Sequence, residues 1–379
     1  MSQRDGEDGR RLRVAVVAKS VIPTGGMECY AFETIRFLLK RGHEVDVLAR
    51  RFDGNALPGV RWIRLPDRCG WSSVASAAEL ALASARILAA RSYDVVHSHE
   101  RTAGQDLLTF HCFTYRGSLA RYGRLRRIDQ TFLSPRSWIY LGLERRQALS
   151  PMVAAVSEAV RADLLAQYPG SKVTVIPPGV DLARFSPERR LVLRDEARRA
   201  FGYTSEDLVL LFVGSEFRRK GLDRIFPLLH GNLRLLVAGQ GDQRERHERL
   251  AERTGGRVRF AGLVADVMGC YAAADAVLLP SRSEAFGMSI LEGMACGLPV
   301  AVSANAGIAS ILTPGRNGFL WDEASAAAML SGLADPVVRA TVGDGARKTA
   351  EGFAWERVGQ RYEELYLHRA AEKKRLRAA

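Results

Sequence analysis

Short apolar runs alternate with longer amphipathic stretches along the first half of the chain. Residues 12–18 (LRVAVVA) form a nearly continuous β-branched run, which is typical of a buried parallel strand, and the breaker-rich segment VIPTGG follows it. Residues 27–40 place apolar side chains at broadly helical spacing, and a second apolar run over residues 44–49 follows the break at Gly42. This order predicts a strand-helix-strand unit with parallel strands.

The same order recurs in both halves of the chain. In the first half we expect a helix at residues 80–90, strands at residues 94–97 and 152–156, and a helix that begins near Ser157. A second series follows the Pro-Pro-Gly turn at residues 177–179, and its strands again alternate with helix-like stretches. Its predicted strands lie at residues 208–213, 233–238, 258–260, 276–279 and 299–302.

We therefore predict two Rossmann-like α/β domains, an N-terminal one over residues 1–170 and a C-terminal one over residues 171–354. Because open parallel sheets bind ligands at the carboxyl ends of their strands, we expect an active site in a cleft between the two domains. Residues 355–379 carry apolar side chains at helical spacing before an end rich in Lys and Arg. They predict a helix that packs back on the N-terminal domain and frays at its end.

The composition also indicates the cellular compartment and whether the cysteines form disulfides or bind zinc. The chain has 379 residues, of which 47% are apolar and 26% are charged, and it contains no apolar run near the ~18 residues that a membrane-spanning helix needs. Residues 1–13 are polar and lack an apolar signal core, so we expect a cytoplasmic protein. The five cysteines are scattered without a CxxC spacing, which favours structural thiols over a disulfide frame or a zinc site.

The net charge of +13 is concentrated in the first part of the chain. Residues 1–150 hold 24 Lys and Arg against 15 Asp and Glu. Such a surplus predicts an anionic partner for the N-terminal half: nucleic acid, a phosphorylated substrate or the acidic face of a membrane. The charge alone does not distinguish among these three kinds of partner.

The segment at residues 281–299, SRSEAFGMSILEGMACGLP, carries two glutamates, Glu284 and Glu292, that are separated by seven residues. A strand should deliver Glu284 onto a loop, and the turn at Gly287 then opens a helix whose free N–H groups can hold a diphosphate. Glu292 lies about two helical turns further on, and carboxylates suit the vicinal diols of sugars and riboses because they accept two hydrogen bonds. The spacing alone is equally compatible with a capped amphipathic helix that carries two solvated glutamates.

The segment at residues 213–224, VGSEFRRKGLDR, places three consecutive cations, Arg218, Arg219 and Lys220, after a predicted strand. Cations at this position suit a diphosphate whose charge grows as its leaving-group bond breaks. A solvated basic turn is the alternative, but the placement at a strand end favours binding.

These segments occur in one chain together with VIPPGVD (175–181), VAGQGD (237–242) and VRFAGL (258–263). In this order they resemble the retaining GT-B glycosyltransferases of family 4, which carry an E-x7-E signature. The resemblance covers nearly the whole chain, is very specific in the C-terminal domain and is looser over residues 52–150. Within the family it looks closest to the lipopolysaccharide core glucosyltransferases, whose F-x-R-K-G-x-D-R segment matches residues 217–224.

The resemblance assigns roles to individual residues. It implies that Glu284 binds the hydroxyls of the donor sugar and acts at the reacting centre with His99, whereas Glu292 binds the ribose. His97 is expected in the core, and Ser215 stands where many relatives have an arginine, so Arg219 is expected to supply that charge. The remaining implied contacts are Gly25, Gly26, Arg219 and Lys220 with the diphosphate, Ala285, Phe286, Gly287 and Met288 with the sugar, and Leu263 with the base.

The region at residues 115–140 interleaves six arginines with five aromatic residues. It is expected to face the acceptor or the headgroups of an anionic membrane, and an ordinary solvated basic loop is the alternative. Nucleic acid would also suit the charge, but no nucleic-acid motif accompanies it, and we expect no nucleic-acid partner. The chain has no D-x-D triad, so no metal or other cofactor is expected.

The resemblance thus implies a hexosyltransferase that moves a hexose, expected to be glucose, from a UDP-sugar with retention. A saccharide acceptor is expected, lipid-linked or part of a lipopolysaccharide core or another cell-envelope glycan, at the inner face of the cytoplasmic membrane. The alternatives are a nucleotide-sugar epimerase of the same fold and a non-catalytic basic binding module. A dinucleotide-dependent oxidoreductase is weaker, because VIPTGG after the first strand is not G-x-G-x-x-G.

Overall fold

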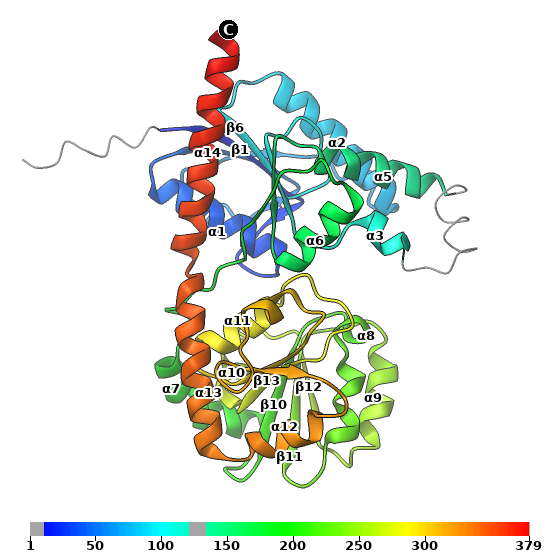
Figure 1. The fold of residues 1–379 in the computed structure, drawn as a ribbon, viewed down its shortest axis with the longest axis vertical. Helices are drawn as coiled ribbons and strands as arrows, with labels where there is room; N and C mark the ends of the chain where they lie inside the picture. Colours follow the sequence, from blue (N-terminus) through cyan, green and yellow to red (C-terminus); the bar gives the residue numbers. More distant parts are fainter. Residues whose placement is uncertain (1–10, 121–133, 379) are drawn as a thin grey trace, which may run out of the picture. The chain divides into compact units, whose positions relative to one another are not determined.

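The computed structural model describes residues 11–120 and 134–378, and it divides into two compact units (Figure 1). Unit 1 comprises Met1–Pro178 and Trp355–Ala379, and unit 2 comprises Gly179–Ala354. None of the helices within the described residues is long and apolar enough to cross a membrane.

Unit 1 is built on a parallel sheet, which has seven strands within its described residues, in the order β5-β3-β1-β6-β7-β8-β9. Its order reverses between β1 and β6, as in other doubly wound sheets. A separate parallel pair joins β2 to β4. The strands are β1 (Arg13–Val17), β2 (Ser20–Val21), β3 (Glu44–Ala49), β4 (Arg51–Phe52), β5 (Arg61–Arg64), β6 (Val95–Ser98), β7 (Leu107–Phe110), β8 (Met152–Ala155) and β9 (Val173–Val175).

Helices cover the sheet of unit 1, and side chains from alternate strand positions meet them. Ala15 and Val17 of β1 and Leu48 of β3 pack with Leu80 of the helix Ser73–Ala89 in one buried cluster. Because successive residues of a strand point to opposite faces, this cluster fixes which face of the sheet that helix covers. The helices are α1 (Met27–Lys40), α2 (Ser73–Ala89), α3 (Tyr115–Ala120), α5 (Pro135–Ala148), α6 (Glu158–Gln167) and α14 (Trp355–Ala378).

The sequence-predicted helix at residues 27–40 and strand at residues 44–49 are confirmed with the same bounds. The helix predicted at residues 80–90 starts earlier, at Ser73, because the Ser72 hydroxyl accepts a hydrogen bond from the Ala75 amide and caps the first turn. Residues 171–178 group with unit 1, since β9 pairs with β8 and extends the sheet.

The last helix, α14, lies along α1 in unit 1 (Figure 1). The expected fraying of its basic end is wrong, since the helix continues to Ala378. Arg369 and Lys373 both contact the Asp106 carboxylate, at 3.0 and 2.9 Å, and these two contacts hold this part of the helix against the body of unit 1.

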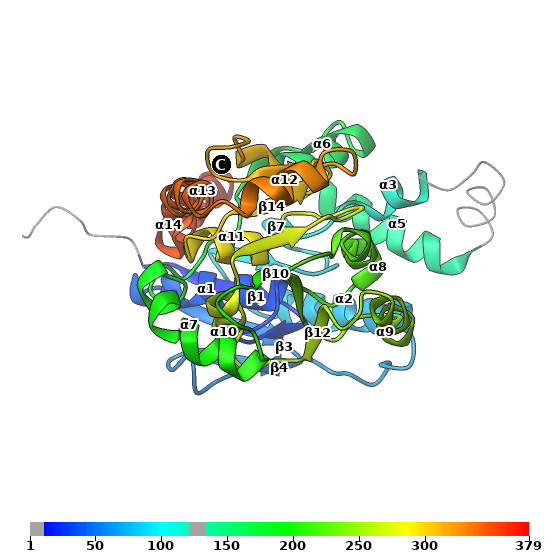
Figure 2. The same cartoon turned by 90° about the horizontal axis from the view of Figure 1, so that it is seen from below.

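All residues of unit 2 are described, and they form a six-stranded parallel sheet in the order β12-β11-β10-β13-β14-β15. Helix α7 packs along α10, and α11 packs against α13 (Figure 2). The strands are β10 (Leu208–Val213), β11 (Leu233–Ala238), β12 (Val258–Gly262), β13 (Ala276–Leu279), β14 (Val300–Ser303) and β15 (Phe319–Trp321). The helices are α7 (Pro187–Phe201), α8 (Phe217–Lys220), α9 (Arg244–Glu252), α10 (Met268–Ala273), α11 (Met288–Ala295), α12 (Ala326–Leu333) and α13 (Pro336–Ala350).

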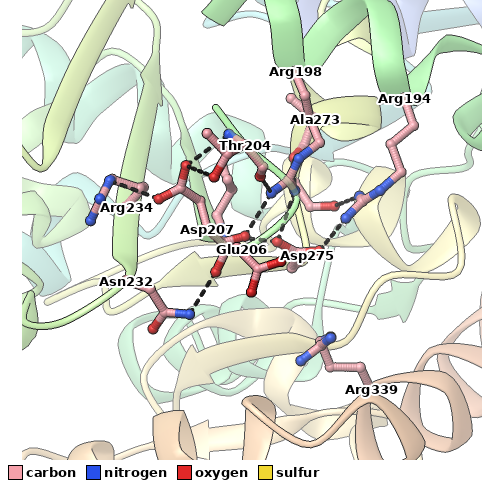
Figure 3. A network of polar contacts seen from close by, with 12 residues as sticks. Arg194, Arg198, Thr204, Glu206, Asp207, Asn232, Arg234, Ala273, Asp275 and Arg339 are labelled. Atoms are coloured by element: carbon pink, nitrogen blue, oxygen red, sulfur yellow. Dashed lines mark hydrogen bonds and ion pairs between the residues drawn. The ribbon is translucent and has the colours of Figure 1, made fainter. Parts of the chain in front are cut away.

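A buried charge cluster ties α7 to the amino ends of the central strands of unit 2 (Figure 3). Asp275 directly precedes β13, and its carboxylate binds Arg194 at 2.5 Å, Arg198 at 3.1 Å and the Val209 amide of β10 at 2.8 Å. Arg198 also donates to the carbonyls of the loop that leads into β10, at Asp207 among others. The cluster thereby sets β10 and β13 side by side, and their carboxyl ends carry the two segments singled out in the sequence.

Candidate active site

In unit 2, Glu284 meets the basic segment at the carboxyl edge of the sheet. Glu284 lies in the loop after β13, is 9% exposed, and accepts the Gly307 amide on its carbonyl at 3.0 Å. Its Oε2 lies 2.8 Å from Nζ of Lys220 and 3.3 Å from the Arg219 guanidinium, which also donates to the Ser283 carbonyl at 2.5 Å. The two cations end the short helix α8 after β10, so neighbouring parallel strands bring the three charges together.

The cations determine the ionisation of Glu284. Burial acts to raise the pKa of this carboxyl, but the charges of Lys220 and Arg219 outweigh it and hold the pKa below its ordinary value. The Arg219 guanidinium also forms an ion pair with the Glu216 carboxylate, at 2.5 Å, so it is shared between two acids. The site therefore presents an ionised carboxylate and two cations. The carboxylate can accept hydrogen bonds from sugar hydroxyls, and the cations can bind a diphosphate.

Two glycines allow this close packing. Gly214 follows β10 with φ of +154°, and a side chain there would clash with the aliphatic stem of Lys220. Gly221 ends α8 in the left-handed conformation, with φ of +76°, and a side chain there would clash with the carbonyl of Pro280. A larger residue at Gly214 would displace the Lys220 side chain, and one at Gly221 would push the end of α8 away from Pro280.

Glu292 lies on α11 and is hydrogen-bonded to another side chain of the protein, unlike a solvated glutamate. The Tyr271 hydroxyl lies 2.6 Å from Oε2 of Glu292 and 2.8 Å from the Ser289 carbonyl. Burial raises the pKa of Glu292 to about 6, and the Tyr271 hydrogen bond opposes the shift. Glu292 thus ionises close to neutral pH, and no motif in the sequence pointed to Tyr271 as its partner.

The other residues expected at the donor lie along the same edge of unit 2. Gly287 caps α11 with φ of +113°, Ala285 and Phe286 are buried before it, and Met288 is the first residue of the helix. Leu263 follows β12 and is 76% exposed, so its side chain is open to a ligand. Arg218 is exposed, unlike the two cations that contact Glu284.

In unit 1, His99 follows β6 and lies in a pair of histidines. Its Nδ1 is 2.9 Å from Nε2 of His111, which follows β7, and burial lowers the pKa of both imidazoles, that of His111 to about 3. Nε2 of His99 is buried without a hydrogen-bond partner within the described residues. The residue lines a cavity of about 110 Å³ together with Glu100, Arg101 and Gln147, among others.

His97 is a core residue, as expected. It is fully buried, and its ring nitrogens lie 2.6 Å from the Tyr366 hydroxyl of α14 and 2.8 Å from Oγ1 of Thr109. Its ring packs 4.2 Å from that of His99, so it supports the candidate site without facing the cavity lining.

The glycine loop precedes α1. Gly25 adopts φ of +89°, and a Cβ there would lie 2.7 Å from Oε2 of Glu28, whereas Gly26 is the N-cap residue of α1 with no side-chain cap. Both leave the backbone open to close approach by a ligand.

Part of the basic aromatic region lies outside the described residues, namely residues 121–133 with Arg121, Arg124, Arg126, Arg127, Tyr122 and Phe132. The described part includes α5, where Trp138 is 60% and Ile139 is 40% exposed. Arg136 and Arg145 are exposed on the same helix, and Tyr140 is buried. The helix thus combines exposed apolar and cationic side chains.

Sequence reasoning missed Tyr271 and His111. The position of each residue beside an apolar run could have marked it as a candidate. His111 directly follows the run LLTF at the carboxyl end of β7, and Tyr271 begins the segment YAAADAVLLP, which contains β13. Their roles depend on contacts with residues 12 to 21 positions away, which no local pattern indicates.

Comparison with known proteins agrees with this arrangement. The sequence model of the family described as "Glycosyl transferases group 1" matches residues 194–347, and that described as "Glycosyltransferase Family 4" matches residues 24–184. A protein of Actinosynnema mirum named D-inositol 3-phosphate glycosyltransferase is 30% identical over 91% of this chain and 94% of its own length.

Solved structures match both units. The crystal structure of WaaG, a glycosyltransferase involved in lipopolysaccharide biosynthesis, has a TM-score of 0.80 at 25% identity and covers 93% of this chain and 99% of its own. Anabaena HepE, solved in complex with UDP and glucose, has the same fold, with a TM-score of 0.71 at 19% identity over 94% of this chain and 99% of its own. The chain is therefore a glycosyltransferase enzyme that belongs to family 4, the group 1 glycosyltransferases with the GT-B fold.

Proposed function

We propose that this enzyme transfers a hexose, glucose in the first instance, from a UDP-sugar to a hydroxyl of an acceptor, with retention of configuration. The observation that carries the proposal is the contact of Lys220 and Arg219 with Glu284 at the carboxyl edge of the unit 2 sheet. An ionised carboxylate beside two cations matches the two parts of a nucleotide sugar, hydroxyls and diphosphate. The HepE complexes with UDP and UDP-glucose support the choice of donor.

Each residue has a separate task in this proposal. Glu284, with the backbone of residues 285–288, holds the sugar, and Glu292 accepts the ribose hydroxyls next to the base at Leu263. Lys220 and Arg219 stabilise the negative charge that develops on the diphosphate as its bond to the sugar breaks. Gly25 and Gly26 of unit 1 are proposed to approach the phosphates with their backbone, and His99 to act near the reacting carbon.

We propose same-face substitution as the route to retention. The bond from the anomeric carbon to the diphosphate oxygen breaks, the acceptor oxygen bonds to the same face, and the acceptor proton passes to the departing phosphate oxygen. The chemistry needs no covalent sugar intermediate on the protein. A covalent sugar adduct in a Glu284→Ala variant, detected by intact-protein mass spectrometry, would contradict this route.

The charge of the two cations is proposed to replace a divalent metal. Initial rates of UDP release should then be the same in excess chelator as in added Mg²⁺ or Mn²⁺. A rate that falls at least tenfold in chelator and recovers with one metal would require a metal in the donor site.

The acceptor is proposed to be a polyhydroxyl compound. The name of WaaG favours a saccharide of a lipopolysaccharide core or another cell-envelope glycan, and the name of the Actinosynnema mirum relative favours a phosphorylated cyclitol. Both kinds of acceptor offer secondary hydroxyls on a six-membered ring. Incubation with UDP-glucose and a panel of both kinds, followed by product NMR, distinguishes them and gives the anomeric configuration. An epimerase would convert the donor sugar with no acceptor present, and a binding module would bind no nucleotide.

Peripheral contact with an anionic membrane at the cytoplasmic face is proposed for α5. The exposed side chains of Trp138 and Ile139 lie on a helix with the exposed cations Arg136 and Arg145, a combination that suits the interface of an anionic bilayer. Flotation with phosphatidylglycerol vesicles should recover the protein, and Trp138→Ala should reduce recovery. Equal recovery with phosphatidylcholine vesicles would exclude the charge as its cause.

A further inference from the structure

Four charged side chains of alternating sign follow one another at the carboxyl edge of the unit 2 sheet. Oε2 of Glu216 lies 2.5 Å from Nη2 of Arg219, whose Nη1 lies 3.3 Å from Oε2 of Glu284. The same Glu284 oxygen lies 2.8 Å from Nζ of Lys220. The two acids balance the two cations, so the group as a whole carries no net charge.

A diphosphate that enters this site has to compete with the contacts of Arg219. Nη2 of this side chain donates to Glu216. Nη1 donates to the Ser283 carbonyl at 2.5 Å and to Glu284. A guanidinium binds phosphate best through two parallel N–H groups, and a carboxylate on the same cation repels the phosphate charge. The diphosphate is therefore bound more strongly when one of the acids leaves Arg219.

The two acids differ in how easily they can leave. The Glu284 side chain is only 12% exposed, and its backbone carbonyl accepts the Gly307 amide at 3.0 Å. The Glu216 side chain is 59% exposed, and its carboxylate forms its ion pair with Arg219. Water can solvate the Glu216 carboxylate as soon as it turns away from Arg219, but burial denies Glu284 the same exchange. Glu216 is therefore the acid that gives way.

The backbone that carries the cations is held in place. The Arg282 amide donates to the Arg219 carbonyl at 2.8 Å, and the Arg282 guanidinium donates to the Arg218 carbonyl at 2.7 Å. The same guanidinium makes two contacts of 2.9 Å with the Asp223 carboxylate. These contacts attach the end of α8 to the loop after β13. The exchange of partners on Arg219 therefore needs a movement of the Glu216 side chain only.

We infer that Glu216 competes for Arg219 with the diphosphate of the donor and of the nucleotide product, and thereby limits how tightly the enzyme holds each of them. The inference rests on the proposed function, since it takes Arg219 and Lys220 as the diphosphate contacts. UDP ends in a terminal phosphate and carries about one negative charge more than UDP-glucose at neutral pH. The Glu216 carboxylate therefore weakens the product more than the donor and promotes product release.

Replacement of Glu216 by glutamine tests the inference through a gain in affinity. Glu216→Gln keeps the size of the side chain and removes its charge. Calorimetric titration of the full chain should therefore show that this variant binds UDP about three- to tenfold more tightly than the wild type. UDP-glucose should gain less than UDP. A merely structural role in α8 would give the opposite sign, because loss of the residue would misplace the cations.

Arg219 should be required for most of this gain. In a double-mutant cycle, adding Glu216→Gln to Arg219→Gln should change the UDP affinity by no more than about twofold, because the competition needs the guanidinium. Glu196→Gln is the matched control. It removes an exposed glutamate from α7, whose Arg194 and Arg198 contact the amino ends of the strands, at the opposite edge of the sheet. The UDP affinity of this control should equal that of the wild type.

Four results would overturn the inference: a UDP affinity of Glu216→Gln that equals or falls below that of the wild type, a gain for UDP-glucose that equals or exceeds the gain for UDP, an equal gain in the Arg219→Gln background, or an equal gain in Glu196→Gln. The third result would make Glu216 a repulsive charge that acts without Arg219. Melting temperatures equal to that of the wild type show that the variants are folded.

Inorganic pyrophosphate separates this inference from the proposed function. It presents the diphosphate alone, so its affinity should also rise in Glu216→Gln. If the protein binds no UDP-glucose but Glu216→Gln binds pyrophosphate more tightly than the wild type, the proposed donor is wrong and the competition at Arg219 stands. If the wild type binds UDP-glucose, Lys220→Ala loses it, and Glu216→Gln shows no gain for UDP or pyrophosphate, only the inference fails. Binding of neither UDP-glucose nor pyrophosphate to any variant overturns both.

Discussion

Nζ of Lys220 lies 2.8 Å from Oε2 of Glu284, although 64 residues separate them in the chain. The contact joins the loop after β10 to the loop after β13, and it gives the candidate donor site both its positive and its negative charge. Replacement of Lys220 should therefore weaken the binding of the diphosphate, and replacement of Glu284 should weaken the binding of the sugar.

Lys220→Gln should weaken the binding of UDP and of UDP-glucose alike, by about 10- to 100-fold, because each loses a charge-assisted hydrogen bond worth ~1.5–3 kcal/mol. Glu284→Gln should weaken UDP-glucose more than UDP, since only the former carries the sugar hydroxyls. Calorimetric titration of both ligands provides the measurement. Arg218→Gln removes an exposed cation two residues from Lys220 and should leave both affinities within twofold; an equal loss in this control would assign the effect to general charge.

The affinity for UDP-glucose should decrease as the pH falls through 6. The pKa of Glu292 is about 6, and a ribose diol donates two hydrogen bonds to the ionised carboxylate, so binding below this pH requires that Glu292 lose a proton. Between pH 7 and pH 5 the affinity should fall by about tenfold. UDP-glucose is the suitable probe because its diphosphate does not titrate in this range.

Two variants identify Glu292 as the titrating group. Glu292→Gln should bind UDP-glucose more weakly and with little change between pH 7 and pH 5. Tyr271→Phe removes the hydrogen bond that lowers the pKa of Glu292, so its transition should move to higher pH. A pH dependence that persists in Glu292→Gln would place the titrating group elsewhere.

Asp275→Asn should lower the free energy of unfolding by about 3–5 kcal/mol, because it leaves the buried Arg198 and the nearby Arg194 without their shared counter-charge. Denaturant unfolding followed by circular dichroism measures the change. Glu248→Gln breaks an exposed pair with Arg244 on α9 and should cost no more than about 0.5 kcal/mol. Similar losses in the two variants would show that burial of the Asp275 cluster contributes nothing.

The stability of the protein should fall as the pH drops below about 6.5, in part because of His97. Burial lowers the pKa of His97 to about 3, while an unfolded histidine titrates near 6.5. Between these values the unfolded state binds a proton that the folded state does not, so each pH unit below 6.5 costs about 1.4 kcal/mol per such histidine.

His97→Gln should therefore show a smaller loss of unfolding free energy between pH 7 and pH 5 than the wild type, by about 2 kcal/mol. Urea unfolding at the two pH values gives both losses. The exposed His230 provides the control, since His230→Gln should retain the full wild-type loss. The same loss in His97→Gln and in wild type would mean that His97 does not contribute to it.

Several strands that the sequence missed lie at the edges of the sheets. Central strands such as β1 and β10 have neighbours on both sides and helices on their faces, so they appear as nearly continuous apolar runs. Three missed strands, β5, β9 and β15, are sheet edges of only three or four residues each, with partly exposed side chains, whereas β7, which was also missed, is a short central strand whose residues are all buried. Edge strands need fewer apolar side chains, so their sequences lack that signal.

The sequence by itself determined the two α/β units, most central strands, and the two short segments that carry Glu284, Glu292, Arg219 and Lys220, because apolar periodicity and motif spacing are local properties. Only the tertiary structure decided that Lys220 pairs with Glu284, that Tyr271 contacts Glu292, and that Arg282 contacts the end of α8. Those contacts depend on which strands are neighbours in the sheet, and strand order arises from the packing of the whole unit, not from any segment alone.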